Sequence, residues 1–351
     1  MIPVRNIYYM LSYAFQVLNE NGYSNISTEE FENTADLFAA ILSKGISLQL
    51  KRGLNKSYID ITEPLSAIKG KINVSDSIKT RSIMKSQLVC SYDEFSENCY
   101  FNKILKSTVF LLLKADISKA RKKELKNLML YFTNVDLIDV YSIDWHIKYN
   151  KNNQSYHLLL SICNLVIKGL LQTQADGTTK LMTFLDEQRE CRLYEKFILE
   201  YYRKHYPMLS VNPEQIAWQL DDSDKDMLPI MQSDIMLRKG NHVFIIDAKY
   251  YLHNTQEQYG AHTLHSANLY QIFTYVKNKE YELKDVEHMV SGMLLYAKTD
   301  ETIQPDNSYI MSGNRISVKT LDLNVPFEKI KEQLLSRFLW GVCECGHPDF
   351  Y

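Results

Sequence analysis

The chain has 351 residues, of which 45% are hydrophobic, so it has room for two domains and enough apolar side chains for a buried core in each. Lys and Arg number 40 and Asp and Glu number 42, which gives a net charge of -2. This balance excludes a whole-molecule attraction to a polyanion. Contact with a nucleic acid would therefore need a local basic surface or a partner.

The cysteines and the N-terminus indicate the cellular location. The six cysteines show no spacing typical of a disulfide scaffold, and the opening MIPVRNIYYM lacks the basic region and long apolar core of a signal peptide. The apolar run from Val109 to Leu113 is far too short to span a bilayer. We therefore expect a soluble, cytoplasmic protein with reduced thiols and no membrane contact.

The first half, residues 1–170, has a mixed pattern. Helices are expected at 7–18 and 28–40, followed by short strands and then by helices rich in Leu and Lys. This half shows no clear pattern of catalytic or metal-binding residues. We expect it to form a mixed α/β module separate from residues 171–351.

The second half has the pattern of an α/β domain. A helix starts near Asp186 and ends before Pro207. The pattern predicts strands and two further helices in the following order: strands at 209–220, 230–238 and 242–250, a helix at 266–278, strands at 290–297 and 316–323, and a helix at 327–339. We expect an overall α/β (α+β) fold in which a central mixed sheet is flanked by helices.

The most informative segment is MQSDIMLRKGNHVFIIDAKYY. Two strand-like runs flank the Gly-Asn pair at 240–241, which suits a two-residue type II′ hairpin. That turn sets a register in which Asp234 lies directly opposite Asp247, with Cβ atoms about 4.5–5.5 Å apart. Lys249 projects from the same face because it lies two residues beyond Asp247. Since the run 243–246 is apolar throughout, as in a strand buried on both faces, the three charged groups converge at the edge of a core.

This convergence of charges indicates a chemistry. Two adjacent carboxylates repel each other unless a proton or a cation lies between them. A hard divalent ion, above all Mg²⁺, would relieve the repulsion and leave positions open for water and a phosphate. The arrangement then suits metal-assisted hydrolysis of a phosphodiester, in which Lys249 orients the water or stabilises the developing charge. The alternative is a surface hairpin with an incidental Asp and Lys.

Three further residues could support such a site. Glu195 lies near the apolar stripe of the helix that precedes the sheet and could supply another oxygen ligand, although a solvated Glu at the boundary fits equally well. Gln271 and Tyr275 are four residues apart on one helix face, where they could support the site or contact a DNA backbone. Taken alone, such a pair is more often ordinary helix packing.

These six side chains together resemble the PD-(D/E)xK nuclease core, with Ser233 in place of the proline in that name. Three segments are similar to the McrC family in order and spacing: IPVRNIYYMLSYAF at the start, LSAIKGKI at 65–72 and CSYDEFSENCYFNKILK at 90–106. The resemblance covers essentially the full length. We therefore predict that residues 171–351 form a Mg²⁺-dependent endonuclease domain, with catalytic Asp234, Asp247 and Lys249 and with Glu195 joining the two aspartates as a metal ligand.

The resemblance also implies a partner, McrB, an AAA+ GTPase whose hexameric ring receives the N-terminal part of McrC and is stimulated by it. Methylated double-stranded DNA would be recognised by McrB, and residues 1–170 would be the partner-docking domain. Independently of the family, the sequence contains no G-x(4)-G-K-[ST] loop, so a nucleotide-driven motor would have to be another protein.

Several other polar groups fit structural roles better. The acidic run 93–97 fits a turn and a helix start better than a second metal cluster. The basic stretch 119–126 could meet phosphate, although a solvated helix face is the simpler interpretation. The Cys-x-Cys-x-His at 343–347 lacks a fourth ligand and the usual spacing, so we expect no zinc. His262 and His265 precede the helix that carries Gln271 and could approach DNA, although polar loop residues need no such role.

Two alternatives to a motor-dependent nuclease remain. The chain could be a non-catalytic adaptor that only activates the motor, although an adaptor would not need an acid pair and a lysine on one sheet face. It could also be a stand-alone DNA repair nuclease, which would cut DNA with Mg²⁺ and no partner.

Overall fold

The computed structural model describes residues 2–20, 23, 26, 28–151, 153–175, 187–222, 226–251, 253–258 and 261–342. The chain divides into two compact units. Unit 1 comprises Met1–Leu18 and Leu185–Tyr351, and unit 2 comprises Asn19–Phe184.

The first helix belongs to unit 1 rather than to the residues that follow it. The helix α1 packs against α7, and Asn6 Nδ2 donates hydrogen bonds of 2.8 Å to the backbone oxygens of Leu323 and Val325. The structure therefore differs from a single division near residue 170. The physical reason is that an apolar helix lies with the partner that buries it, and sequence order does not show which partner that is.

Unit 1 is built on a six-stranded sheet with the strand order β12-β13-β11-β8-β7-β4. The strands β8, β11 and β13 are parallel, and the other neighbouring pairs are antiparallel, so the predicted mixed sheet is confirmed. The strands are β4 (Ser210–Asn212), β7 (Ile235–Lys239), β8 (His242–Lys249), β11 (Met289–Ala297), β12 (Asn307–Met311) and β13 (Asn314–Leu321). Two small ribbons are formed by β5 (Gln215–Ile216) with β6 (Met231–Gln232), and by β9 (Thr255–Gln258) with β10 (Ala261–Leu264).

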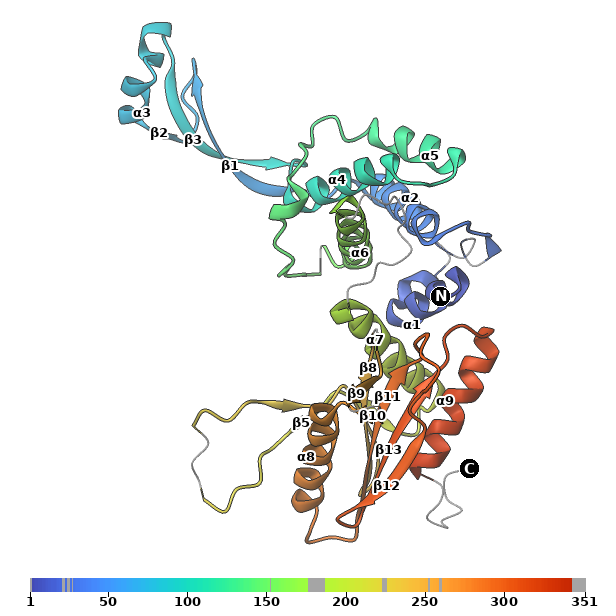
Figure 1. Cartoon of the computed structure of the whole chain (residues 1–351). Coiled ribbons are helices and arrows are strands. Elements are labelled where there is room, and N and C mark those ends of the chain that lie inside the picture. The colour runs from blue at the N-terminus through green and yellow to red at the C-terminus, as the bar shows by residue number, and fades with distance from the viewer. Residues whose placement is uncertain are drawn as a thin grey trace. The chain divides into compact units, whose positions relative to one another are not determined.

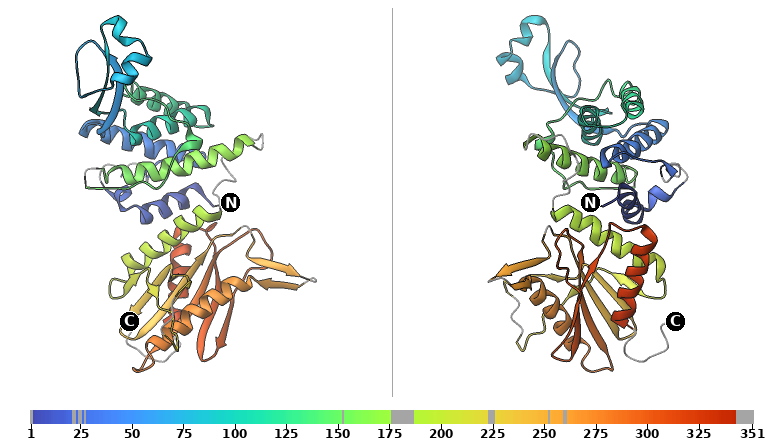
Figure 2. Two further views of the ribbon diagram at one scale, coloured as in Figure 1. Left: turned by 90° about the vertical axis from the view of Figure 1, so that its left-hand side faces the viewer. Right: turned by 45° about the vertical axis from the view of Figure 1, so that its right-hand side comes forward.

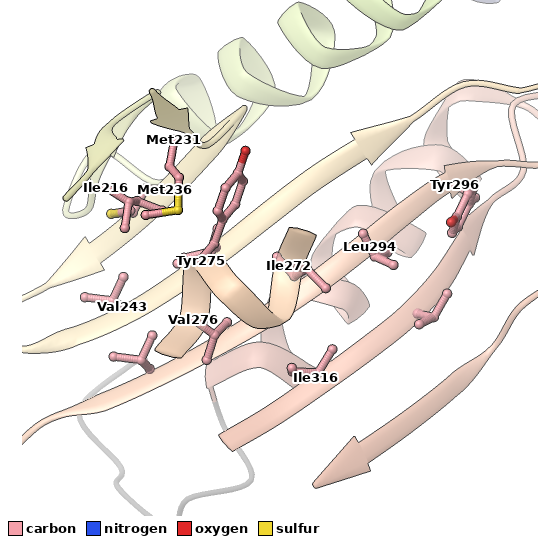
Figure 3. Packing of buried hydrophobic residues seen from close by; sticks show 13 residues of the cluster. Ile216, Met231, Met236, Val243, Ile272, Tyr275, Val276, Leu294, Tyr296 and Ile316 are labelled. Atoms are coloured by element: carbon pink, nitrogen blue, oxygen red, sulfur yellow. The ribbon is translucent and has the colours of Figure 1, made fainter. Parts of the chain in front are cut away.

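Helices cover both faces of this sheet. The helix α8 packs on one face, and α7 and α9 pack on the other (Figures 1 and 2). Their bounds are α1 (Val4–Ala14), the short 3₁₀ helix η1 (Gln16–Asn19), α7 (Glu187–His205), α8 (Ser266–Glu282) and α9 (Phe327–Val342). Figure 3 shows Ile272, Tyr275 and Val276 of α8 packed with Val243 and Leu294 of the sheet. Every residue of β8 between its two ends is buried, as predicted for a strand covered on both faces.

Unit 2 combines packed helices with a three-stranded sheet whose order is β1-β3-β2. The sheet extends away from the helices as an arm (Figure 1). The helices are α2 (Thr34–Arg52), α4 (Tyr100–Lys114), α5 (Lys119–Met129), η4 (Val140–Ser142) and α6 (Tyr156–Ala175). The arm consists of β1 (Ser57–Leu65), β2 (Lys71–Ile72), α3 (Val74–Lys79), η3 (Ser82–Lys85) and β3 (Leu88–Ser96).

Two details of unit 2 differ from the sequence-based expectations. The helix expected at 28–40 is α2, which begins at Thr34 because the Asn33 side chain caps it, accepting a hydrogen bond from Asp36 N at 2.9 Å. Asp93 and Glu94 lie inside β3 rather than at a turn and a helix start. Pairing of β3 with β1 along its whole length outweighs the local preference of these acidic residues for turns.

The structure also bears on the membrane and cysteine expectations. No helix within the described ranges is long and apolar enough to cross a membrane. Cys90, Cys99 and Cys163 are buried free thiols, as expected of reduced cysteines. The C-terminal Cys-x-Cys-x-His at 343–347 lies outside the described residues.

Candidate active site

The hairpin of β7 and β8 has the predicted register. Lys239 pairs with His242 across the turn, and the same register sets Asp234 across from Asp247. Gly240 has a φ of 58°, which lies in the left-handed region, as the first central position of a type II′ turn requires. A local turn signal therefore brings the two carboxylates together.

Asp247 is buried near the C-terminal end of β8, with 1% of its surface exposed. Its Oδ2 atom lies 2.6 Å from Lys249 Nζ. Its Oδ1 atom has no hydrogen-bond partner within the part of the chain that the structure describes. A buried carboxylate oxygen without a partner is costly, so the site has an open position for a proton donor or a cation.

Asp234 lies just before β7 and accepts a hydrogen bond of 2.9 Å from Ala248 N at its Oδ2 atom. Burial raises the pKa of the Asp234 carboxyl to about 8, and the negative charges of Asp247 and Glu195 add to the rise. Lys249 and the hydrogen bond from Ala248 only partly offset it. Without a cation, the Asp234 carboxyl therefore retains a proton at neutral pH.

Lys249 is held in place from two sides. Its side chain is 12% exposed, and its Nζ atom donates a hydrogen bond of 3.1 Å to Gln271 Oε1 in addition to the ion pair with Asp247. Gln271 Nε2 in turn donates a hydrogen bond of 2.9 Å to Tyr275 Oη. Burial lowers the pKa of the Lys249 ammonium, but the charges of Asp247 and Asp234 outweigh burial and leave the pKa above its ordinary value. Lys249 is therefore a fixed cation.

A second amide of α8 lies beside this cation and was missed by the sequence reasoning. Asn268 Nδ2 donates a hydrogen bond of 2.9 Å to Tyr296 Oη, and Tyr251 Oη donates one of 3.3 Å to Asn268 Oδ1. Tyr296 pairs with Lys249 across the parallel β8–β11 ladder. Only the spacing from Asn268 to Gln271, which puts both amides on one helix face, could have indicated this group from sequence.

Glu195 lies on α7 and is partly buried. It is close enough for its charge to raise the pKa of Asp234. Within the described residues, no group of three or more His, Cys, Asp or Glu side chains is placed so that it could hold a metal ion, so Glu195 does not complete a three-carboxylate site with Asp234 and Asp247. Because Mg²⁺ commonly uses one or two carboxylates together with water and phosphate oxygens, the opposed pair of Asp234 and Asp247 still fits such an ion.

The fold and this site define a class of protein. It is an α/β protein in which an acid pair and a lysine lie at the end of a buried strand, beneath a helix that supplies a glutamine and a tyrosine. The chain belongs to the family described as McrBC 5-methylcytosine restriction system component, which it matches over residues 4–297.

A known restriction enzyme is similar to this chain over most of its length, and solved McrBC assemblies are more distantly similar. The type IV methyl-directed restriction enzyme EcoKMcrBC of Escherichia coli (strain K12) is 28% identical over 346 residues, which cover 96% of this chain and 97% of the relative. A half-complex from a tetradecameric assembly of Thermococcus gammatolerans McrB AAA+ hexamers with bound McrC is 16% identical, with a TM-score of 0.49 over 96% of this chain and 76% of that one. A chain of the Thermococcus gammatolerans McrBC complex is also 16% identical, with a TM-score of 0.40 over 57% of this chain and 58% of that one.

Proposed function

We propose that this chain is the DNA endonuclease subunit of a McrBC-type restriction system and that it hydrolyses phosphodiester bonds with Mg²⁺. The observation that carries the proposal is the opposition of Asp234 and Asp247 beside Lys249 at the end of a buried strand. Membership of a restriction-system family supports DNA as the substrate.

Asp234 and Asp247 would hold the ion, with Glu195 as a further oxygen ligand through water. Two features support this donor set: the open Oδ1 position of Asp247 and the raised pKa of the Asp234 carboxyl in the absence of a cation. When bound, Mg²⁺ would activate a water molecule and offset negative charge on the phosphate.

Lys249 would bind a non-bridging oxygen of the scissile phosphate or orient the attacking water. Its ammonium stays charged because Asp247 lies 2.6 Å away, and its position is fixed by Gln271. Tyr275 fixes Gln271 in turn, so these two residues would act by positioning rather than by touching the reacting atoms. A cation placed before the reaction stabilises developing negative charge without reorganisation.

The motor would be a separate protein. The family description names the chain as one component of a system, and these 351 residues contain no phosphate-binding G-x(4)-G-K-[ST] loop. We propose an McrB-like AAA+ GTPase with a hexameric ring as the partner. That partner would recognise methylated double-stranded DNA in the cytoplasm and deliver it to this chain.

The arm of unit 2 suits contact with this partner. Its far part carries large apolar side chains that are exposed, including Ile78 at 62% and Met84 at 83%. Exposed apolar clusters of this kind are typical of protein interaction surfaces. Unit 2 would therefore dock on the motor, while unit 1 would carry the chemistry.

The test is reconstitution of the chain with its motor on methylated duplex DNA, with nicking and GTP turnover measured in parallel. Nicking should require this chain, Mg²⁺ and the motor. Lys249→Ala should abolish nicking and keep GTPase stimulation, whereas Lys284→Ala, at an exposed lysine of unit 1, should leave both unchanged. Nicking by Lys249→Ala at the wild-type rate would refute the nuclease site and would favour the adaptor alternative. Nicking without the motor would show a stand-alone nuclease.

A further inference from the structure

Helix α5 of unit 2 carries an exposed basic face without matching acidic groups. Lys119, Lys123 and Lys126 follow an i, i+4, i+7 spacing, so they lie on one side of the helix, and all three are exposed. None of the three forms an ion pair among the residues that the structure describes. Arg121, by contrast, is paired with Glu124 and with a second glutamate.

The charge of this segment stands out from the rest of the chain. Residues 114–126 contain six basic and two acidic side chains, a local balance of +4, whereas the whole chain has a net charge of -2. Two lysines at the base and on the arm of unit 2 are instead paired with acidic neighbours: Lys56 pairs with Glu97, and Lys69 pairs with Glu94. The α5 face is therefore a local concentration of positive charge.

Packing does not account for these lysines. The inner side of α5 rests on α2 and α4 through Leu125, which is fully buried. Ser118 caps the helix by accepting a hydrogen bond from Arg121 N at 3.4 Å. The helix is thus anchored from beneath and at its start. The repulsion among its outer lysines is a cost that a polyanionic ligand would remove.

We propose that the α5 face formed by Lys119, Lys123 and Lys126 binds the phosphate backbone of double-stranded DNA. The proposal rests on the proposed function, which makes DNA the substrate. A helix of 11 residues is about 16 Å long, and duplex DNA carries one negative charge per about 1.7 Å, so the face can meet several phosphates. Lysine is depleted in protein–protein interfaces, and phosphate contacts carry no sequence information. DNA without sequence preference is therefore favoured over an acidic protein.

The experiment compares two full-length variants that each lose two positive charges. Lys123→Gln with Lys126→Gln removes half of the α5 lysines and keeps helix propensity, because Gln and Lys are similar helix formers. The control, Lys329→Gln with Lys331→Gln, alters α9 of unit 1, where both lysines pair with neighbouring glutamates. Binding of a short, labelled, unmethylated duplex is measured over a series of salt concentrations in EDTA, so that no cleavage occurs.

The α5 variant should bind DNA about tenfold more weakly at low salt, and the slope of log K against log salt should fall by about 1.8, since each lost phosphate contact removes about 0.9. The control should retain the wild-type slope. An unchanged slope in the α5 variant, or an equal loss in the control, would overturn the proposal. Unchanged DNA binding with loss of motor stimulation would assign the face to a protein partner and overturn it too.

The outcome is separable from that of the proposed function. The two proposals have separate readouts: duplex binding in EDTA reports on the α5 face, whereas nicking by Lys249→Ala in the reconstituted complex reports on the nuclease site. If the α5 variant binds and cuts DNA normally in the reconstituted complex, the α5 proposal fails and the nuclease assignment stands. If Lys249→Ala still cuts, the nuclease site fails, whereas the salt dependence still decides the role of α5.

Discussion

In unit 1 the charged side chains of Asp247 and Lys249 are enclosed at the end of β8, whereas in unit 2 the apolar side chains of Ile78 and Met84 are exposed on the arm. Each arrangement is unfavourable for the isolated chain. Burying charge costs solvation, and exposing large apolar groups forgoes hydrophobic stabilisation of roughly 1.5–3 kcal/mol for each side chain.

This contrast between buried charge and exposed apolar surface indicates that the two units bind different kinds of ligand. A buried acid pair with an open oxygen gains most from a small cation, which the fold can surround. An exposed apolar arm gains most from a large surface, which only another macromolecule supplies. The two functions should therefore be separable by substitutions confined to one unit.

The largest effect is expected from Asp247→Asn, because it removes a ligand charge at the only carboxylate of the pair that lies within the buried strand. DNA nicking in the reconstituted complex should fall by about 10³-fold or more, the loss expected when several kcal/mol of charge stabilisation disappear. GTPase stimulation should remain. Calorimetric titration with Mg²⁺ should show weakened binding, and Asp285→Asn, at an exposed carboxylate of unit 1, should change neither readout. Nicking at the wild-type rate by Asp247→Asn would refute the site.

The reverse separation is expected from Ile78→Ser with Met84→Ser on the arm. Loss of anchor side chains that contribute about 2 kcal/mol in total should weaken binding to the motor by about 30-fold, with a matching shift in the concentration that stimulates GTPase. Because both side chains are exposed, the melting temperature should not fall. Leu130→Ser with Leu335→Ser, at exposed leucines outside the arm, is the matched control. Undiminished stimulation by the arm variant would place the docking surface elsewhere.

A smaller effect is expected from the residues that position Lys249. Gln271→Ala removes a hydrogen bond to a charged group, so the nicking rate should fall by about tenfold with little change in Mg²⁺ affinity. Tyr275→Phe removes only the hydrogen bond to Gln271, and the rate should fall by about twofold to fivefold. Single-turnover rates at saturating DNA measure both. A larger loss for Tyr275→Phe than for Gln271→Ala would contradict the order of these contacts.

The sequence was sufficient where the determining interactions are local. The turn at 240–241 fixes the pairing of β7 with β8, and this pairing sets Asp234 opposite Asp247. A period of two residues then sets the face of Lys249. These features depend on neighbours within one hairpin, so a single sequence contains the information that they need.

The sequence was insufficient where distant segments meet. Tyr296 lies beside Lys249 only because β11 is parallel to β8, and α1 lies in unit 1 only because of contacts such as those of Asn6 with Leu323. No local pattern specifies either pairing. The strands β9, β10 and β12 were also missed, because none of these short segments shows the alternation of apolar and polar residues on which the prediction relied.

The smallest expected effect concerns the pH dependence of stability. It tests whether the Asp234 carboxyl in unit 1 is shielded from water as its burial indicates. The pKa of Asp234 is about 8 in the folded chain and near its ordinary value of 3.8 when unfolded. Between these values the folded state binds more protons, so this carboxyl contributes stability that is complete below about pH 4 and is lost as pH rises through 8. In EDTA, the melting temperature of the wild type should therefore fall between pH 5 and pH 8 by several degrees more than that of Asp234→Asn. Mg²⁺ should restore it at pH 8 in the wild type only, because the ion binds the folded, deprotonated pair. An equal change in melting temperature with pH for the two proteins would show that the Asp234 carboxyl is solvated, and would contradict the proposed metal site.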